Sequence, residues 1–111
     1  MPAAQASQTR TEFLLVADPA LGLESNQIPL EIGRWTIGSG SENRLVVKGP
    51  GIDEQHCLIL VRSGQLLMKS WGQQTLVNGE ESGEAFLKAG DVLTLGESDF
   101  QIRHDLSLIH I

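Results

Sequence analysis

The chain has 111 residues, 41% of them hydrophobic but only 5% aromatic, and its formal net charge is −6. Its length suits one domain with a real core. The acidic balance argues against binding to nucleic acid or to an anionic membrane surface, since both depend on basic patches. Protein and small-molecule partners remain open.

A single cysteine, Cys57, excludes an internal disulfide and any cysteine-rich zinc site. Small secreted domains often carry disulfides, so the composition favours a reducing compartment, and we expect a cytoplasmic location. No apolar run approaches the roughly 18 residues of a membrane span, and the N-terminus lacks the apolar core of a signal peptide. Residues 1–11 are small and polar, which predicts a flexible tail.

From residue 12 onward, short runs rich in Leu, Val and Ile alternate with turn signals. This pattern is typical of a sandwich or barrel of short strands, and two dipeptides, Ser63-Gly64 and Asn78-Gly79, predict tight hairpin turns. The expected strands are Glu12–Ala17, Ile28–Ile32, Trp35–Gly38, Arg44–Val47, His56–Arg62, Gln65–Ser70, Thr75–Val77, Ala85–Leu87, Val92–Leu95 and Asp99–Arg103.

The C-terminal run Leu106–Ile111 is compatible with a last strand, the start of a missing segment or a cloning remnant. We expect residues 105–111 to be a tail or final strand, and we expect the domain to be part of a larger protein.

The sequence offers no convergent catalytic set. His56 and Cys57 are neighbours on an expected strand and would point to opposite faces, so they cannot act directly as a base and nucleophile. His104 and His110 have no acidic partners at a metal-binding spacing. The acidic residues Glu80, Glu81 and Glu84 are typical of a solvated turn. We therefore expect no enzyme activity, no metal and no cofactor.

The stretch 38–41, Gly-Ser-Gly-Ser, is neither a Walker A loop nor a dinucleotide fingerprint. Its backbone amides could hold an anion, or the stretch could be a plain connecting loop.

Three separated blocks, residues 35–47, 50–59 and 75–79, resemble the forkhead-associated (FHA) family in order and spacing, and Leu87–Asp91 and Leu95-Gly96 extend the likeness. The resemblance covers residues 12–104. It implies an all-β sandwich of about eleven short, mostly antiparallel strands, whose loops at one end bind phosphothreonine peptides.

The resemblance also assigns roles to individual positions. It implies structural roles for Gly38, His56, Thr75 and Gly79. The phosphopeptide loop positions would be Ser39, Ser41, Arg44, Asp53, Gln73 and Asn78.

The sequence departs from the family at the ligand positions. Ser39 stands where the family has its phosphate-gripping Arg, Asp53 stands where it has a phosphate-binding Ser, and Gln73-Gln74 replaces Asn-Gly. The three loops hold Arg44 and Lys48 against Glu42, Asp53 and Glu54, a net charge of −1. Since phosphothreonine carries about −1.5 to −2, we predict weak or absent phosphothreonine recognition.

The predicted function is therefore a non-catalytic protein–protein interaction module that binds a protein or peptide. The alternative is a phosphothreonine reader with a rearranged site built on Ser39 and Arg44. Some FHA-like domains of bacterial secretion-system ring proteins are similar, because they keep the sandwich and lack the phosphate-gripping residues. Trp71 either caps the core or belongs to a docking surface.

Overall fold

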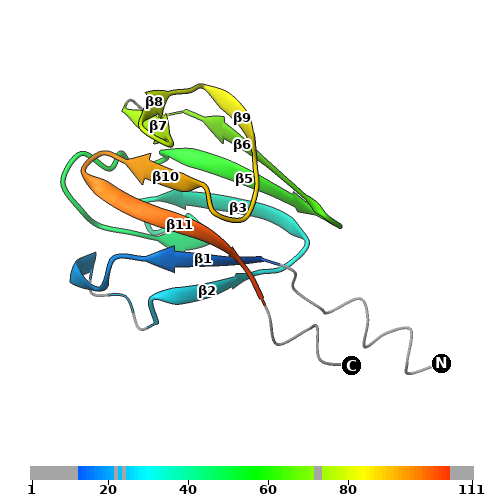
Figure 1. Ribbon diagram of the computed structural model, residues 1–111. Helices are drawn as coiled ribbons and strands as arrows, with labels where there is room; N and C mark the ends of the chain where they lie inside the picture. The colour runs from blue at the N-terminus through cyan, green and yellow to red at the C-terminus, as the bar shows by residue number, and fades with distance from the viewer. Residues whose placement is uncertain (1–12, 22, 24, 72–73, 106–111) are drawn as a thin grey trace.

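The computed structural model describes residues 13–21, 23, 25–71 and 74–105, and they form a sandwich of two β-sheets (Figure 1). The residues that it describes contain one short 3-10 helix (Pro19–Leu21) and no helix able to span a membrane. The strands are β1 Phe13–Ala17, β2 Gln27–Leu30, β3 Gly33–Gly38, β4 Leu45–Val46, β5 Cys57–Arg62, β6 Gln65–Ser70, β7 Thr75–Val77, β8 Glu80–Glu81, β9 Glu84–Leu87, β10 Val92–Leu95 and β11 Ser98–His104. The expected all-β fold of eleven strands is confirmed.

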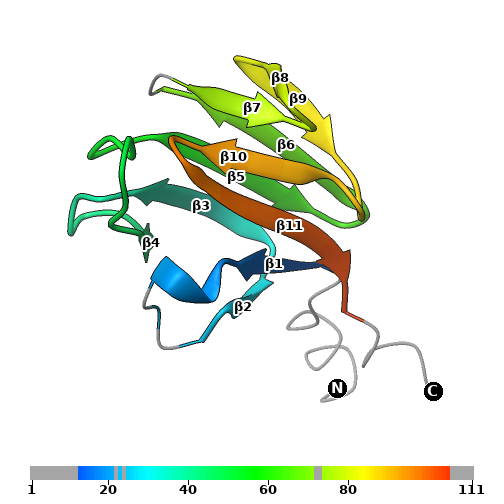
Figure 2. The same cartoon turned by 60° about the vertical axis from the view of Figure 1, so that its left-hand side comes forward.

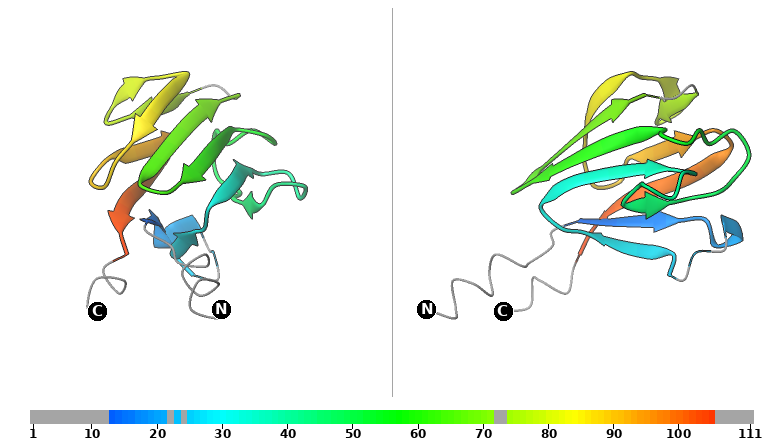
Figure 3. Two further views of the ribbon diagram at one scale, coloured as in Figure 1. Left: turned by 90° about the vertical axis from the view of Figure 1, so that its right-hand side faces the viewer. Right: turned by 180° about the vertical axis from the view of Figure 1, so that it is seen from behind.

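One sheet has the strand order β2-β1-β11-β10-β7-β8, and the other has the order β4-β3-β5-β6-β9. All pairs are antiparallel except β3 with β4. The two layers are seen from the side in Figure 3. Edge strands β2 and β4 lie on the same side of the sandwich (Figure 2), and both line a groove of about 400 Å³ that has no ionisable side chain in its wall.

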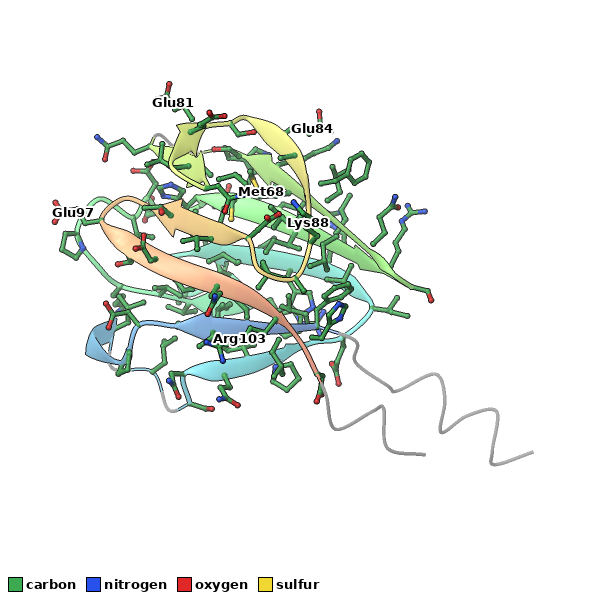
Figure 4. All side chains as sticks on the ribbon, in the orientation of Figure 1. Met68, Glu81, Glu84, Lys88, Glu97 and Arg103 are labelled. Atoms are coloured by element: carbon green, nitrogen blue, oxygen red, sulfur yellow. The ribbon has the colours of Figure 1, made fainter. Side chains whose placement is uncertain are left out.

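The core follows from strand alternation, because every second side chain points between the sheets. Leu15 and Phe100 from one sheet meet Ile59, Leu66 and Met68 from the other, and all five are fully buried. Figure 4 shows Met68 pointing between the layers. Burying such side chains supplies roughly 1.5–3 kcal/mol each, which offsets the conformational entropy lost on folding.

Both predicted hairpin turns are confirmed. Arg62 pairs with Gln65 across Ser63-Gly64. Asn78 and Gly79 have φ values of 53° and 86°, so both turn residues adopt the left-handed conformation that this dipeptide favours.

Several strand boundaries differ from expectation. The second strand ends at Leu30 instead of Ile32, which is 57% exposed in the following turn. Only Leu45–Val46 of the expected Arg44–Val47 is a strand, whereas β3 starts two residues early, at Gly33. Glu80–Glu81, expected as turn residues only, form the short strand β8, although both remain exposed. The run Leu106–Ile111 and residues 1–12 lie outside the described residues.

Candidate functional site

The loops that follow β3 and β4 meet at one end of the sandwich, the left-hand end in Figure 1. The Ser39 amide donates to the Asp53 carbonyl at 2.9 Å, and the Gly40 amide donates to the Glu54 carbonyl at 3.1 Å. Closer to the sheet, the His56 amide donates to the carbonyl of Ile37 in β3 at 2.9 Å. These three bonds continue the β3–β5 pairing into the loops, so the backbone at this end is fixed.

Gly38 is required where β3 enters its loop. A Cβ atom built on Gly38 would overlap the Glu54 carbonyl and would come within 2.9 Å of the Asn43 side-chain nitrogen. The structure thus gives a steric reason for a glycine where the sequence predicted a structural one.

His56 ties the second loop to the sandwich. Its ring is fully buried, and its Nδ1 accepts a hydrogen bond from the Asp53 amide at 3.0 Å. The neutral ring therefore carries its proton on Nε2. This contact uses the Asp53 backbone, while the Asp53 residue itself is exposed at the loop surface. The geometry is that of a loop-holding histidine.

Asn43 holds the first loop and was not singled out from the sequence. It is only 7% exposed, and its Nδ2 donates to the Gly40 carbonyl at 2.8 Å and to the Glu54 carbonyl. Asn43 thereby joins the two loops. The signal was its place in the first motif block, but the sequence alone does not tell a loop-holding amide from a ligand-binding one.

Arg44 points away from the loop end. Its guanidinium lies 3.9 Å from the ring centroid of Trp35 and 3.0 Å from the Glu31 carboxylate, and it donates to the Arg34 carbonyl at 3.1 Å. Arg34 and Trp35 lie at the start of β3 and Glu31 lies just before it, whereas the loop follows the end of β3. Arg44 and Ser39 are therefore not brought together into one anion site.

The turn between β10 and β11 joins the same end, which the sequence did not predict. The Gly96 amide donates to the Gln74 carbonyl at 3.1 Å, and the Glu97 amide donates to the Pro50 carbonyl at 3.1 Å. A Cβ atom on Gly96 would lie 2.5 Å from the Gly51 backbone, so only glycine permits this contact. Gln74 has a φ of 58°, the left-handed conformation that the family's glycine would adopt easily.

The net charge at this end is more negative than the −1 counted from the sequence of the loops. With Arg44 directed elsewhere, Lys48 remains as the cation among the described residues of the two loops. Opposite it stand Glu42, Asp53 and Glu54, all exposed, and Glu97, which Figure 4 shows at the same end. An incoming phosphate would meet a negative field here.

Asn78 and Thr75, two further predicted positions, make side-chain hydrogen bonds inside the protein. The Asn78 side chain donates to Asp91 at 3.0 Å and accepts from the Val92 amide at 2.9 Å, which fastens the β7–β8 hairpin to β10. Thr75 is 3% exposed, and its hydroxyl lies 2.7 Å from the Ser70 hydroxyl. Ser41 is exposed, and Gln73 lies outside the described residues.

Trp71 and Cys57 have opposite environments. Trp71 is 50% exposed, so it does not cap the core. Cys57 is fully buried on β5, and burial raises the pKa of its thiol to about 12. Within the described ranges no three metal-ligating side chains cluster.

Comparisons with known proteins agree with this geometry. Residues 22–105 match the family described as the inner membrane component of the type III secretion system (T3SS), cytoplasmic domain. No curated protein matches the chain.

Among solved structures, an FHA domain studied for its phosphothreonine-dependent interactions has a TM-score of 0.75 and 25% identity, with 84% of this chain and 96% of that chain covered. The FHA domain of the CT664 protein from Chlamydia trachomatis has a TM-score of 0.72 at 23% identity, covering 84% and 97% of the two chains.

A third solved structure comes from a secretion system itself. The cytoplasmic domain of the T3SS sorting platform protein PscD from P. aeruginosa has a TM-score of 0.71 at 20% identity, covering 86% of this chain and 82% of that one. The sandwich and the family match over most of the chain point to the same fold, and His56 holds its loop within that fold. The chain therefore belongs to the family of cytoplasmic domains of the T3SS inner membrane component, and its fold is that of an FHA domain.

Proposed function

We propose that this chain is a non-catalytic docking domain of a secretion-system inner membrane component, that it works on the cytoplasmic side, and that it binds a protein partner independently of phosphothreonine. Membership of the family supports the cytoplasmic setting. The observation that carries the proposal is the loop end, where Arg44 lies on Trp35; the resemblance to FHA domains puts Ser39 and Asp53 at the phosphate-gripping positions of that fold.

The energetic argument concerns charge-assisted hydrogen bonds. An Arg bound to a phosphate contributes about 1.5–3 kcal/mol for each hydrogen bond. Here the Ser39 hydroxyl is a neutral donor, and the Asp53 carboxylate would repel the phosphate. For Arg44 to serve instead, it would have to leave both the Trp35 ring and the Glu31 carboxylate. Among the described residues, Lys48 is then the cation of the loop end, and four carboxylates oppose it: Glu42, Asp53, Glu54 and Glu97.

Isothermal titration of the protein with a phosphothreonine peptide library tests the proposal. We expect no binding at micromolar concentration. The matched control is the double variant Ser39→Arg/Asp53→Ser, which restores the family residues on the same loops and should gain measurable binding. Micromolar binding by the unmodified protein that is lost on Arg44→Ala would overturn the proposal in favour of a rearranged phosphothreonine site.

A further inference from the structure

The outer face of the β4-β3-β5-β6-β9 sheet carries an apolar row that crosses three strands. Leu60 on β5 pairs with Leu67 on β6, and Leu67 pairs with Phe86 on β9. Their chain neighbours Ile59, Val61 and Leu66 point into the core, so these three side chains point outward. Leu60 and Leu67 are half-buried, and Phe86 is 64% exposed.

Basic side chains surround this row. Arg34 on β3 stands in register with Leu60 and extends the row. Arg62 follows Leu60 by two residues on β5, and Lys69 follows Leu67 by two residues on β6, so alternation places both on the same face. All three are exposed. We call Leu60, Leu67, Phe86, Arg34, Arg62 and Lys69 the basic–apolar face.

Among the described residues, the acid that pairs across this face is Glu84, in register with Lys69 at a distance of 3.9 Å between the charged atoms. Three bases therefore face one acid, in a chain whose formal net charge is −6. Figure 4 shows Glu84 at the β9 margin of the molecule. The positive charge is thus concentrated beside the exposed apolar row.

The outer face of the other sheet has a different character. Leu14 pairs with Arg103, and Thr94 pairs with both Asp99 and Leu76. Glu81 lies opposite Leu76 at its edge, so this face has two acids and one base among the residues named. Figure 4 shows Arg103 and Glu81 on this sheet. The two faces differ in the sign of their charge, although both are built from alternating strands.

We propose that the basic–apolar face is the docking surface of this domain and that its partner is an acidic protein segment with apolar anchor side chains. An apolar centre with a charged rim is the anatomy of a protein interface, and carboxylates on the partner would complement the three cations. Exposed apolar patches mark such interfaces in soluble domains. This inference rests on the proposed docking function and gives it a location away from the loop end.

The probe is a synthetic amphipathic peptide with Leu and Phe anchors between Glu residues, together with the same peptide carrying Lys for Glu. Both are titrated into 15N-labelled protein and followed by the amide NMR signals. We expect the acidic peptide to shift the signals of Leu60, Leu67 and Phe86 and their neighbours, and the basic peptide to leave them in place.

Two variants test the face, and each has a matched control. Phe86→Ser and Arg62→Glu should each weaken binding of the acidic peptide at least about fivefold, because a central aromatic anchor and a complementary charge are lost. Leu76→Ser removes an apolar side chain from the outer face of the other sheet, and Arg103→Glu reverses a charge on that face; both should change binding less than twofold. Thermal melts confirm that every variant is folded.

Three results would overturn the inference. The first is that the acidic peptide fails to bind, or shifts signals away from the basic–apolar face. The second is sedimentation with phosphatidylglycerol vesicles that is lost on Phe86→Ser, which would make a membrane the occupant. The third is self-association in analytical ultracentrifugation that is lost on Phe86→Ser, which would make a second copy the occupant. If a phosphothreonine peptide binds and its NMR signal shifts are confined to residues 39–56, the proposed function is refuted. The titration with the acidic peptide then still decides whether the basic–apolar face is a docking surface.

Discussion

Gly38, Asn43 and His56 hold the two loops in place through contacts inside the protein. Each makes its contacts inside the protein: Gly38 against the Glu54 carbonyl, Asn43 with Gly40, and His56 with the Asp53 amide. The gripping positions, by contrast, have changed chemistry.

Gly38→Ala should destabilise the protein by about 1–3 kcal/mol, because the added methyl group meets backbone that cannot move away easily. Urea unfolding measures the change. The control is Gly83→Ala, where an added Cβ has nothing within 4 Å, and it should shift the unfolding free energy by less than about 0.5 kcal/mol. Equal effects of the two substitutions would contradict the steric argument.

Asp91 links pH to stability. Burial acts to raise its pKa, but hydrogen bonds from Asn78 and from the Lys88 amide and ammonium, together with the Lys88 charge, outweigh burial, and the net pKa is lowered. The folded protein then binds fewer protons than the unfolded chain, whose Asp pKa is about 3.9. Stability from this group is present above that value and is lost as the pH falls through the folded-state pKa.

We therefore expect Asp91→Asn to lower the unfolding free energy at pH 7 by about 1–3 kcal/mol, since a charged acceptor of several hydrogen bonds is lost. As the pH falls below about 4, the variant should also lose less unfolding free energy than the unmodified protein. Urea unfolding across this range is the measurement. The comparison is Asp99→Asn, which changes an exposed carboxylate that accepts a hydrogen bond from Thr94. This variant should lose as much unfolding free energy at low pH as the unmodified protein.

At the scale of elements, the alternating apolar pattern was sufficient to predict most strands, because each has one buried face. β6 and β10 match the expected ranges from end to end. β8 was missed because its two glutamates have no buried side chain, and only pairing with Leu76 and Val77 makes them a strand. Strand formation there depends on a partner that no local pattern encodes.

Site residues were harder to predict than strands for a related reason. The sequence places Arg44 next to the loop but does not reveal the direction of its side chain, which depends on the approach of Trp35 from the neighbouring strand. Likewise, the sequence does not reveal that the Asn78 side chain bonds Asp91 and the Val92 amide, which come from a later strand region. Contacts between distant segments decide both outcomes.

The packing of Arg44 on β3 has a measurable energy. Arg44→Ala should lower stability by about 0.5–2 kcal/mol, through loss of the cation–π contact with Trp35 and of the bond to Glu31. Lys48→Ala removes an exposed cation from the neighbouring loop and should have a smaller effect. If urea unfolding gave the same small change for both, the assignment of Arg44 to the scaffold would be wrong.

For the molecule as a whole, charge is segregated. Acids gather at the loop end, while the outer face of one sheet is basic around an apolar row. The net charge of −6 therefore does not describe either surface. An acidic loop end disfavours the phosphothreonine ligand of FHA domains, and the basic face gives an acidic partner a separate place to dock.

The two sheets share one core, so we expect the sandwich to unfold as a unit, and Cys57 reports on this. Its thiol is fully buried on β5, between β3 and β6, and burial raises its pKa to about 12. Both accessibility of the thiol and formation of the thiolate therefore require opening of the core.

At pH 8, labelling by a thiol reagent should be at least about 10³-fold slower in native than in urea-unfolded protein, because a stability of 5 kcal/mol leaves less than about one molecule in 10³ open. The unfolding free energy from labelling across urea concentrations should equal that from tryptophan fluorescence, with Cys57→Ala as the thiol-free blank. Labelling that is fast and independent of urea would mean that β5 opens locally, and it would contradict unfolding of the sandwich as a unit.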